Sequence, residues 1–418
     1  MHLRRIGLGR AWVAWGLAAS FYLVALFHRM SLGVASLDAQ ERFGLSAGTI
    51  ATLSALQLGL YLAWTIPAGL AADRIGPRRA LTIGLVLMAV GETAFGLAAA
   101  APLALGGRAL VGVGDAFMFL SVLRIAQNWF PARRYALLAS LTGLAGAIGQ
   151  IGTTVPLGAA LEGIGWTATF AGSGALTAAL AVLCMRFVRD RPAGAPAPGG
   201  APDARRMPVG ATLRAAWTQP ATRRAFWSHF ALMGPFVAIT ALWGYPWLVR
   251  AQDVAPATAR AWLMLCVVAF GASAPAFGAL AARGPAVRDA LLRWGAVALA
   301  AGWSAALLWP GGHAPAAVVV TALVLTGLAG ACAMLSFDVA RAGNPSEHAG
   351  AATGLANTGG FSAAVATQLA AAAVLHVADV PIGVALLPML GLLLAAAVRV
   401  VRGGGRRAPE EAPAALAA

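Results

Sequence analysis

Long apolar runs follow one another along almost the entire chain, and they constrain its fold more than any other feature. A helix needs roughly 20 apolar residues to cross the hydrocarbon core of a bilayer. The 418 residues are 60% hydrophobic and only 11% charged, whereas a soluble domain carries about 25% charged residues. Inside lipid, backbone polar groups must pair within the segment. The sequence therefore predicts an all-α membrane protein that has membrane lipid as its surroundings.

The apolar runs divide into twelve predicted transmembrane helices. They cover residues 11–35, 47–70, 80–100, 102–127, 136–160, 165–188, 225–248, 259–282, 286–309, 314–340, 349–376 and 380–401. A stretch rich in Pro, Gly and Ala separates the sixth run from the seventh, and its composition predicts a flexible linker that packs no core. The expected organisation is an N-terminal six-helix half (1–189), a linker (190–222), a C-terminal six-helix half (223–402) and a tail (403–418).

The basic residues are distributed very unevenly between the two sides of the predicted membrane. All 30 are arginines, of which 24 fall at the termini and in alternate loops, while three fall on the opposite side and three within spans. An excess of arginine marks the cytoplasmic side of a membrane protein. We therefore expect a multi-pass protein of the cell membrane with both termini in the cytoplasm. This distribution explains the net charge of +15 without a nucleic-acid partner.

The two predicted halves repeat each other weakly. Gly69-x-x-x-Asp73-Arg74-x-Gly76 recurs as Gly278-x-x-x-Ala282-Arg283-Gly284, in which the acid and one position are lost. Arg124 and Asp338 each precede a proline by seven residues, at the ends of the fourth and tenth spans. Repeated halves with a binding site between them are typical of secondary transporters. The fold expected is therefore twelve helices in two pseudo-symmetric halves.

The segment from Gly69 to Arg79 places four charges in a short turn between two spans. Gly69 permits close helix approach and Gly76 permits a bend that a Cβ would resist; the charged members are Asp73, Arg74, Arg78 and Arg79. The pattern G-x-x-x-D-R-x-G-x-R-R resembles the loop joining helices 2 and 3 of the major facilitator superfamily. Arg108-x-x-x-Gly112-x-Gly114 in the fourth span resembles that family's arginine-and-glycine motif. The resemblance covers nearly the whole chain and implies a transporter whose two halves rock about a central site.

Two arginines inside the spans are candidates for binding an anion. Arg29 lies in a stretch similar to one in anion-transporting branches of the family, where the arginine meets the negative charge of the substrate. By counting 1.5 Å per residue, Arg29 and Arg108 both lie about 10 Å from the bilayer centre toward the outside. Two guanidinium groups at one depth could clamp a carboxylate or phosphate. The alternative is that each pairs locally, Arg108 by locking its helix through carbonyl contacts.

Asp115, near the centre of the fourth span, is the candidate for proton coupling. A carboxyl group removed from water holds a proton more readily than one in water. The alternative is a static ion pair with Arg29 or Arg108. For Glu92 and His229 we expect packed or hydrogen-bonded neutral groups. Further polar or aromatic residues could line a cavity or simply pack: Phe21, Tyr22, Gln57, Tyr61 and Gln368.

Gating is expected at the cytoplasmic ends of the helices. Asp73 is predicted to hold these ends together, with Arg74 and Arg78 or a helix end as partners. Arg124 and Asp338 are predicted to form a salt bridge in one state, although Asp338 could instead pair locally with Arg341. Gly69, Gly76 and Arg79 complete the predicted gating loop.

The sequence contains no nucleotide-binding loop, nucleophile elbow or metal-ligand cluster, so we expect no enzyme, no cofactor and no metal site. The resemblance implies a monomeric secondary active transporter that moves a small polar solute, with an anion favoured, by alternating access. Proton-coupled import, a symport, is the leading interpretation. The alternatives are uniport, an exporter of hydrophobic compounds or drugs, and a transporter-like membrane sensor. The fifth span lacks the Gly-Pro pair of proton-antiporting drug exporters, which disfavours drug export.

Overall fold

The computed structural model describes residues 2–45, 47–192, 208–377 and 380–403, and these are helical apart from short connections. The N-terminal elements are α1 (His2–Val34), α2 (Ser36–Phe43), α3 (Ala47–Arg74), α4 (Pro77–Leu97), α5 (Ala101–Trp129), η1 (Ala132–Arg134) and α6 (Tyr135–Phe187). The later elements are α7 (Val209–Thr218), α8 (Pro220–Ala238), η2 (Ile239–Trp243), α9 (Gly244–Pro246), η3 (Trp247–Ala251), α10 (Pro256–Ala281), α11 (Pro285–Leu307), α12 (Ala316–Ala333), α13 (Leu335–Ala342), η4 (Ser346–His348), α14 (Ala349–Val377), α15 (Ile382–Ala385) and α16 (Leu387–Gly403).

The predicted twelve-helix membrane fold is confirmed. Within the described residues, eleven helical segments are long and apolar enough to cross a membrane, and α3, with 28 residues, lies between the first two of them. The 53-residue α6 carries two of the segments. Its backbone leaves helical geometry at Gly165 (φ 77°, ψ 174°), because an unbroken helix of that length would far exceed the thickness of a bilayer.

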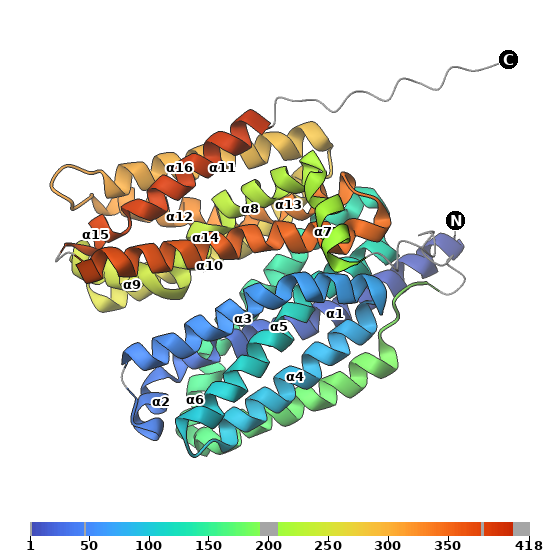
Figure 1. The fold of residues 1–418 in the computed structure, drawn as a ribbon, viewed down its shortest axis with the longest axis horizontal. Coiled ribbons are helices and arrows are strands. Elements are labelled where there is room, and N and C mark those ends of the chain that lie inside the picture. The colour runs from blue at the N-terminus through green and yellow to red at the C-terminus, as the bar shows by residue number, and fades with distance from the viewer. Residues whose placement is uncertain (1, 46, 193–207, 378–379, 404–418) are drawn as a thin grey trace.

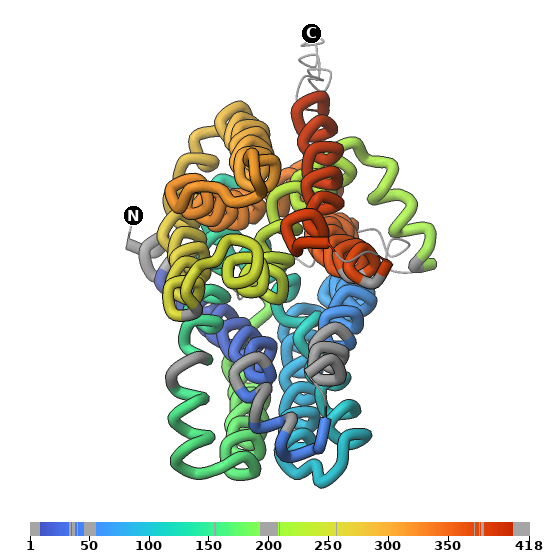
Figure 2. Tube along the Cα trace, turned by 90° about the vertical axis from the view of Figure 1, so that its left-hand side faces the viewer, coloured from blue at the N-terminus to red at the C-terminus, as the bar shows by residue number. Residues whose placement is uncertain are grey.

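The helices form two bundles that lie side by side (Figures 1 and 2). Elements α1 to α6 make one half and α8 to α16 the other, with α7 beside the second. Because the number of spans is even, α1 begins and α16 ends at the same end of the molecule, on the right in Figure 1. We call this end the termini side and the opposite end the far side.

Glycines bring α4 and α5 into close contact inside the N-terminal half. A Cβ on Gly91 would lie 2.6 Å from the carbonyl oxygen of Gly107, and a Cβ on Gly107 would lie 2.6 Å from that of Gly91. Such reciprocal backbone approach is what small residues permit between membrane helices. It places Glu92, the residue after Gly91, against Arg108, the residue after Gly107.

The two halves meet at the termini side through two matching helix pairs. On α3, a Cβ at Gly69 would lie 2.7 Å from the carbonyl oxygen of Gly350 on α14. On α10, a Cβ at Gly278 would lie 2.7 Å from the Cα of Leu137 on α6. Gly69 and Gly278 are the first residues of the repeat seen in the sequence, so the two copies make equivalent contacts with the other half.

One segment differs from the expected organisation. The predicted linker 190–222 contains a helix, α7, near its end. Thr212 and Ala216, one turn apart, are buried on one face of α7, so this part of the linker packs on the C-terminal half through α8 and α14. A composition rich in small residues concealed that amphipathic spacing. Residues 193–207 and 404–418, which include most of the predicted tail, lie outside the described residues.

Candidate functional site

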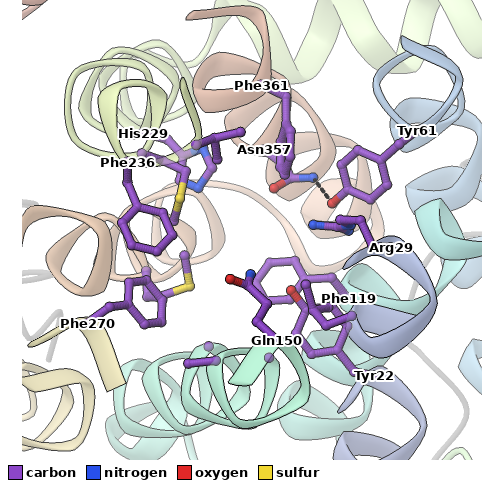
Figure 3. A pocket seen from close by; sticks show the side chains of 17 residues that line it. Tyr22, Arg29, Tyr61, Phe119, Gln150, His229, Phe236, Phe270, Asn357 and Phe361 are labelled. Atoms are coloured by element: carbon purple, nitrogen blue, oxygen red, sulfur yellow. Dashed lines mark hydrogen bonds between the residues drawn. The ribbon is translucent and has the colours of Figure 1, made fainter. Parts of the chain in front are cut away.

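A cavity of about 60 Å³ lies between the two halves (Figure 3). Helices α1, α3, α5 and α6 contribute polar and aromatic side chains from one half, and α8, α10 and α14 contribute the opposite wall. Its lining includes Tyr22, Arg29, Tyr61, Phe119, Gln150, His229, Met233, Phe236, Phe270, Asn357 and Phe361. The sequence had singled out Tyr22, Arg29, Tyr61 and His229 among these. Gln150 and Asn357 escaped it, although an amide inside an apolar run was the available signal.

A second cavity joins the first and leads toward the far side. The two share Arg29, Tyr61 and Phe361 among their lining residues. The second adds Thr240 of η2, which follows α8, and Gln368, farther along α14 toward the far side, together with Asp115 and Gln57. The space between the halves is therefore continuous from Arg29 toward the far side.

Arg29 and Asp115 form a bidentate ion pair in the cavity wall. Arg29 Nε lies 2.6 Å from Asp115 Oδ2, and Nη2 lies 3.0 Å from Oδ1. The Asp115 side chain is fully buried, whereas that of Arg29 is 12% exposed. The guanidinium group also lies 4.4 Å from the centre of the Tyr61 ring, where a cation is attracted to the ring face. Of the alternatives left open for Asp115, the structure shows the ion pair with Arg29.

Arg108 does not reach the cavity, and the expected clamp of two arginines is absent from this arrangement. Its guanidinium group is fully buried and bonds to Glu92 at 3.2 Å, to Ser31 Oγ at 3.1 Å and to the carbonyl of His28 at 2.8 Å. It also donates to Gln57 Oε1. Arg29 and Arg108 had been placed at one depth, but depth says nothing about rotation around the helix axis. The rotation of α5 turns Arg108 into the interior of the N-terminal half.

Glu92 sits at the centre of the same buried network. His28 Nδ1 lies 3.0 Å from Glu92 Oε1, and His28 Nε2 lies 2.7 Å from Thr177 Oγ1. These contacts link α1, α4, α5 and α6. Burial of a carboxylate requires such partners, so Glu92 is packed within its half, as expected from the peripheral position of its helix.

Contacts around Asp73 close the termini side. Asp73 Oδ1 lies 3.3 Å from Arg124 Nη2, and its Oδ2 accepts a hydrogen bond of 3.0 Å from the backbone N–H of Gly350 at the start of α14. Arg124 also donates to the carbonyl of Ser346 at 3.0 Å. Of the partners expected for Asp73, the helix end is observed as a hydrogen-bond donor and the charge of Arg74 also acts on the carboxylate. Arg124 is an addition that the sequence did not reveal.

Asp338 belongs to a separate network in the C-terminal half. It pairs with Arg288 at 2.7 Å and with Arg341 at 3.1 Å. Arg341 also lies over the Tyr135 ring of the other half, 4.7 Å from its centre. The expected salt bridge between Arg124 and Asp338 is thus not made in this state, and the local alternative with Arg341 is.

The remaining residues of the Gly69–Arg79 loop shape the termini side. Gly76 has a φ of 89°, a conformation that favours glycine, and a Cβ there would lie 2.6 Å from Asp190 Oδ2. The other oxygen of Asp190 accepts a bond of 2.7 Å from the backbone N–H of Arg78, at the start of α4. Arg74 and Arg79 are exposed.

The sequence profile of the Major Facilitator Superfamily matches residues 17–368. A probable sulfoacetate transporter, SauU, of Cupriavidus necator is 23% identical over 177 residues, covering 42% of this chain and 41% of that relative. The multidrug efflux pump LfrA of Mycolicibacterium smegmatis is 33% identical over 186 residues, covering 43% of this chain and 36% of the pump. The chain therefore spans about two fifths of the length of the curated relatives it matches.

Among solved structures, the chain is similar to FucP, a Major Facilitator Superfamily transporter, in its outward conformation. The TM-score is 0.70 at 16% identity, and the match covers 95% of this chain and 100% of FucP. At this identity the likeness shows a shared fold. Twelve spans in two halves, a cavity between them and a profile match over most of the residues lead to one conclusion: this chain belongs to the Major Facilitator Superfamily.

Proposed function

We propose that the protein is a secondary active transporter that carries a small organic anion across the cell membrane by alternating access, coupled to protons. The observation that carries this proposal is the Arg29–Asp115 ion pair, which stands in the wall of a cavity between two rocking halves. The arginine asymmetry makes the termini side cytoplasmic. The closed contacts at that side and the cavity leading away from it then correspond to an outward-facing state of a monomer.

The ion pair supplies a physical means of coupling. A guanidinium group binds a carboxylate through two parallel N–H bonds, and both of these face Asp115 in the present state. Protonation of Asp115 removes the charge that holds Arg29, and the guanidinium then becomes free for an anionic solute. Proton and anion therefore bind together and cross in the same direction, which is symport.

The test begins with purified protein in detergent. Thermal unfolding is measured with sulfoacetate, tartrate and galactonate, with a neutral sugar as control, because a ligand that binds the native state raises the apparent stability. An anion that stabilises the protein is then followed into proteoliposomes.

Substitutions of Arg29 decide the role of that residue. Arg29→Lys should weaken uptake of the anion, because lysine keeps the charge but loses the planar fork, and Arg29→Ala should abolish uptake. Full transport of every solute by Arg29→Ala would refute the proposal.

Export of a hydrophobic compound is the second candidate. The aromatic side chains of Phe119, Phe236, Phe270 and Phe361 in the cavity favour it, and one relative is named as a multidrug efflux pump. Efflux of a cationic dye from cells that express the protein, unaffected by Arg29→Ala, would select this candidate over the anion symporter.

A further inference from the structure

Two buried nitrogen atoms, one in each half, have no hydrogen-bond partner and belong to side chains that line the cavities. They are Nε2 of Gln57 and Nε2 of His229. Gln57 is 3% exposed and His229 is 1% exposed, and the two line the second and the first cavity respectively. A buried polar group left without a partner is costly, and native proteins rarely keep one without a reason.

The neighbours of these side chains fix both free atoms as donors. Arg108 has only donors to offer, so the Gln57 atom that it contacts must be the carbonyl oxygen, and the free atom is the NH₂ group. The backbone N–H of Gly360 donates to His229 Nδ1 at 3.1 Å. A neutral imidazole that accepts at Nδ1 carries its hydrogen on Nε2. Each half therefore has one buried nitrogen that carries hydrogen and acts as a donor, Gln57 Nε2 in one and His229 Nε2 in the other.

The positions of the two donors match the two ends of one solute. Gln57 lines the same cavity as Arg29 and Asp115, so its NH₂ group adds a donor on the side where the anion would bind. His229 stands in the opposite half, and Figure 3 shows it across the first cavity from Arg29. The walls between them carry mainly aromatic and aliphatic side chains, such as Phe119 and Phe236.

We propose that the solute is an organic acid with a second oxygen acceptor, a hydroxyl, carbonyl or further carboxylate, at the other end of a short carbon chain. This inference rests on the proposed anion transport and specifies its substrate class. The carboxylate binds Arg29 and Gln57, and the second acceptor receives the N–H of His229. Such a solute links the two halves directly, whereas a simple acid engages only the N-terminal half.

Matched acids test the inference by binding to the purified full-length protein, measured by calorimetry. The probes are butyrate, 4-hydroxybutyrate and succinate, and the longer series hexanoate, 6-hydroxyhexanoate and adipate. In at least one series, the acids with a second acceptor should bind about 10-fold more tightly than the simple acid, the effect of one buried hydrogen bond. His229→Phe should erase this preference, so that the acids of a series bind with similar affinities. Gln57→Leu should weaken all acids of a series by a similar factor.

Two further variants control for shape and folding. Met233→Leu changes another cavity residue on α8 without removing a donor, and the preference should persist. His229→Gln offers an NH₂ group near the place of Nε2 and should recover part of the preference. A cooperative thermal unfolding transition, measured in detergent, shows that His229→Phe is folded.

The outcomes separate this inference from the proposal on which it rests. If acids bind and depend on Arg29, but a second acceptor brings no gain or the gain survives in His229→Phe, the inference is wrong and anion binding stands. If Arg29→Ala binds every acid as tightly as the native protein, or if the native protein binds none of the acids, the anion proposal itself fails and the inference fails with it.

Discussion

Arg29 and Arg108, two arginines within spans of the N-terminal half, show how differently one residue type can be used at one expected depth. Arg29 holds a single carboxylate and borders the cavity, whereas Arg108 is enclosed by four polar partners. A charge enclosed in this way stabilises the arrangement of helices only while its partners remain. Arg29 is therefore placed to respond to a solute, and Arg108 to hold α1, α3 and α4 against α5.

Asp115→Asn should separate coupling from exchange. Asparagine keeps the shape of the side chain but cannot take up a proton or hold Arg29 through charge. In proteoliposomes with an imposed pH gradient, we expect the variant to lose uphill accumulation and to retain counterflow exchange, which needs no net proton movement. Unchanged uphill transport would move the proton site elsewhere, with Glu92 and His229 as the next candidates.

The enclosed arginine leads to a stability prediction. Arg108→Met leaves Glu92 buried beside only His28 and Ser31 and should destabilise the protein by about 3–5 kcal/mol. Adding Glu92→Met removes the orphaned charge and should recover much of that loss. Thermal unfolding of the single and double variants in detergent measures both effects. A double variant less stable than Arg108→Met alone would contradict this account of the network.

At the scale of elements, the glycine repeat fixes how the halves touch. Gly69 lets α3 approach α14, and Gly278 lets α10 approach α6, both at the termini side. The second copy carries Ala282 where the first has Asp73, so only the first can accept a hydrogen bond from the opposite helix end. The glycine contacts at the termini side therefore follow the pseudo-two-fold symmetry of the halves, whereas the charged contact of Asp73 has no counterpart in the second copy.

Gly69→Ala should push the halves apart at the termini side, because its Cβ would lie 2.7 Å from a backbone oxygen that cannot rotate away. A buried reporter, Ser140→Cys, lies beside Gly278. In a background where the three native cysteines are replaced, we expect a maleimide to label this reporter faster in Gly69→Ala than in the parent protein.

Gly59→Ala on the same helix is the matched control, since no atom lies within 4 Å of the added Cβ. It should label like the parent protein. Equal labelling in both alanine variants would show that the α3–α14 contact does not hold the termini side closed.

For the whole molecule, the charges at the termini side form two networks rather than one bridge. Arg124 forms an ion pair with Asp73 and donates a hydrogen bond to the carbonyl of Ser346, just before α14. Asp338 forms ion pairs with Arg288 and Arg341. An interaction made in one state only shifts the balance between states by its differential free energy. Each network therefore contributes its own bias toward the state in which the termini side is closed.

This arrangement predicts the result of exchanging charges. Arg124→Asp combined with Asp338→Arg should not restore the balance between the two states. The first substitution places a second carboxylate beside Asp73. The second places a third guanidinium group beside Arg288 and Arg341, which now pair with Asp338. Arg124→Asp combined with Asp73→Arg should recover part of the closed population, although the acceptor for Gly350 is lost. Labelling of the Ser140→Cys reporter from the termini side compares the two double variants. Rescue by the first pair would re-establish a direct bridge between Arg124 and Asp338.

Much of this protein is determined by its sequence alone. Apolar segments partition into lipid and arginine-rich loops stay in the water on one side of the membrane. Each segment does this independently of its tertiary contacts, so span length and the side on which arginine accumulates can be read from the sequence. Twelve helices and two repeated halves therefore follow without tertiary information, and the Gly69–Arg79 loop identifies the family.

Only the tertiary structure decided where the polar side chains of the spans point. Counting residues along a helix gives depth, but the rotation of α5 against α1, α3 and α4 is set by packing such as the Gly91–Gly107 contact. That rotation assigns Arg29 to the cavity and Arg108 to Glu92 and Gln57. The donor polarity of Gln57 and His229 likewise comes from partners distant in the chain, 51 and 131 residues away, which no local pattern encodes.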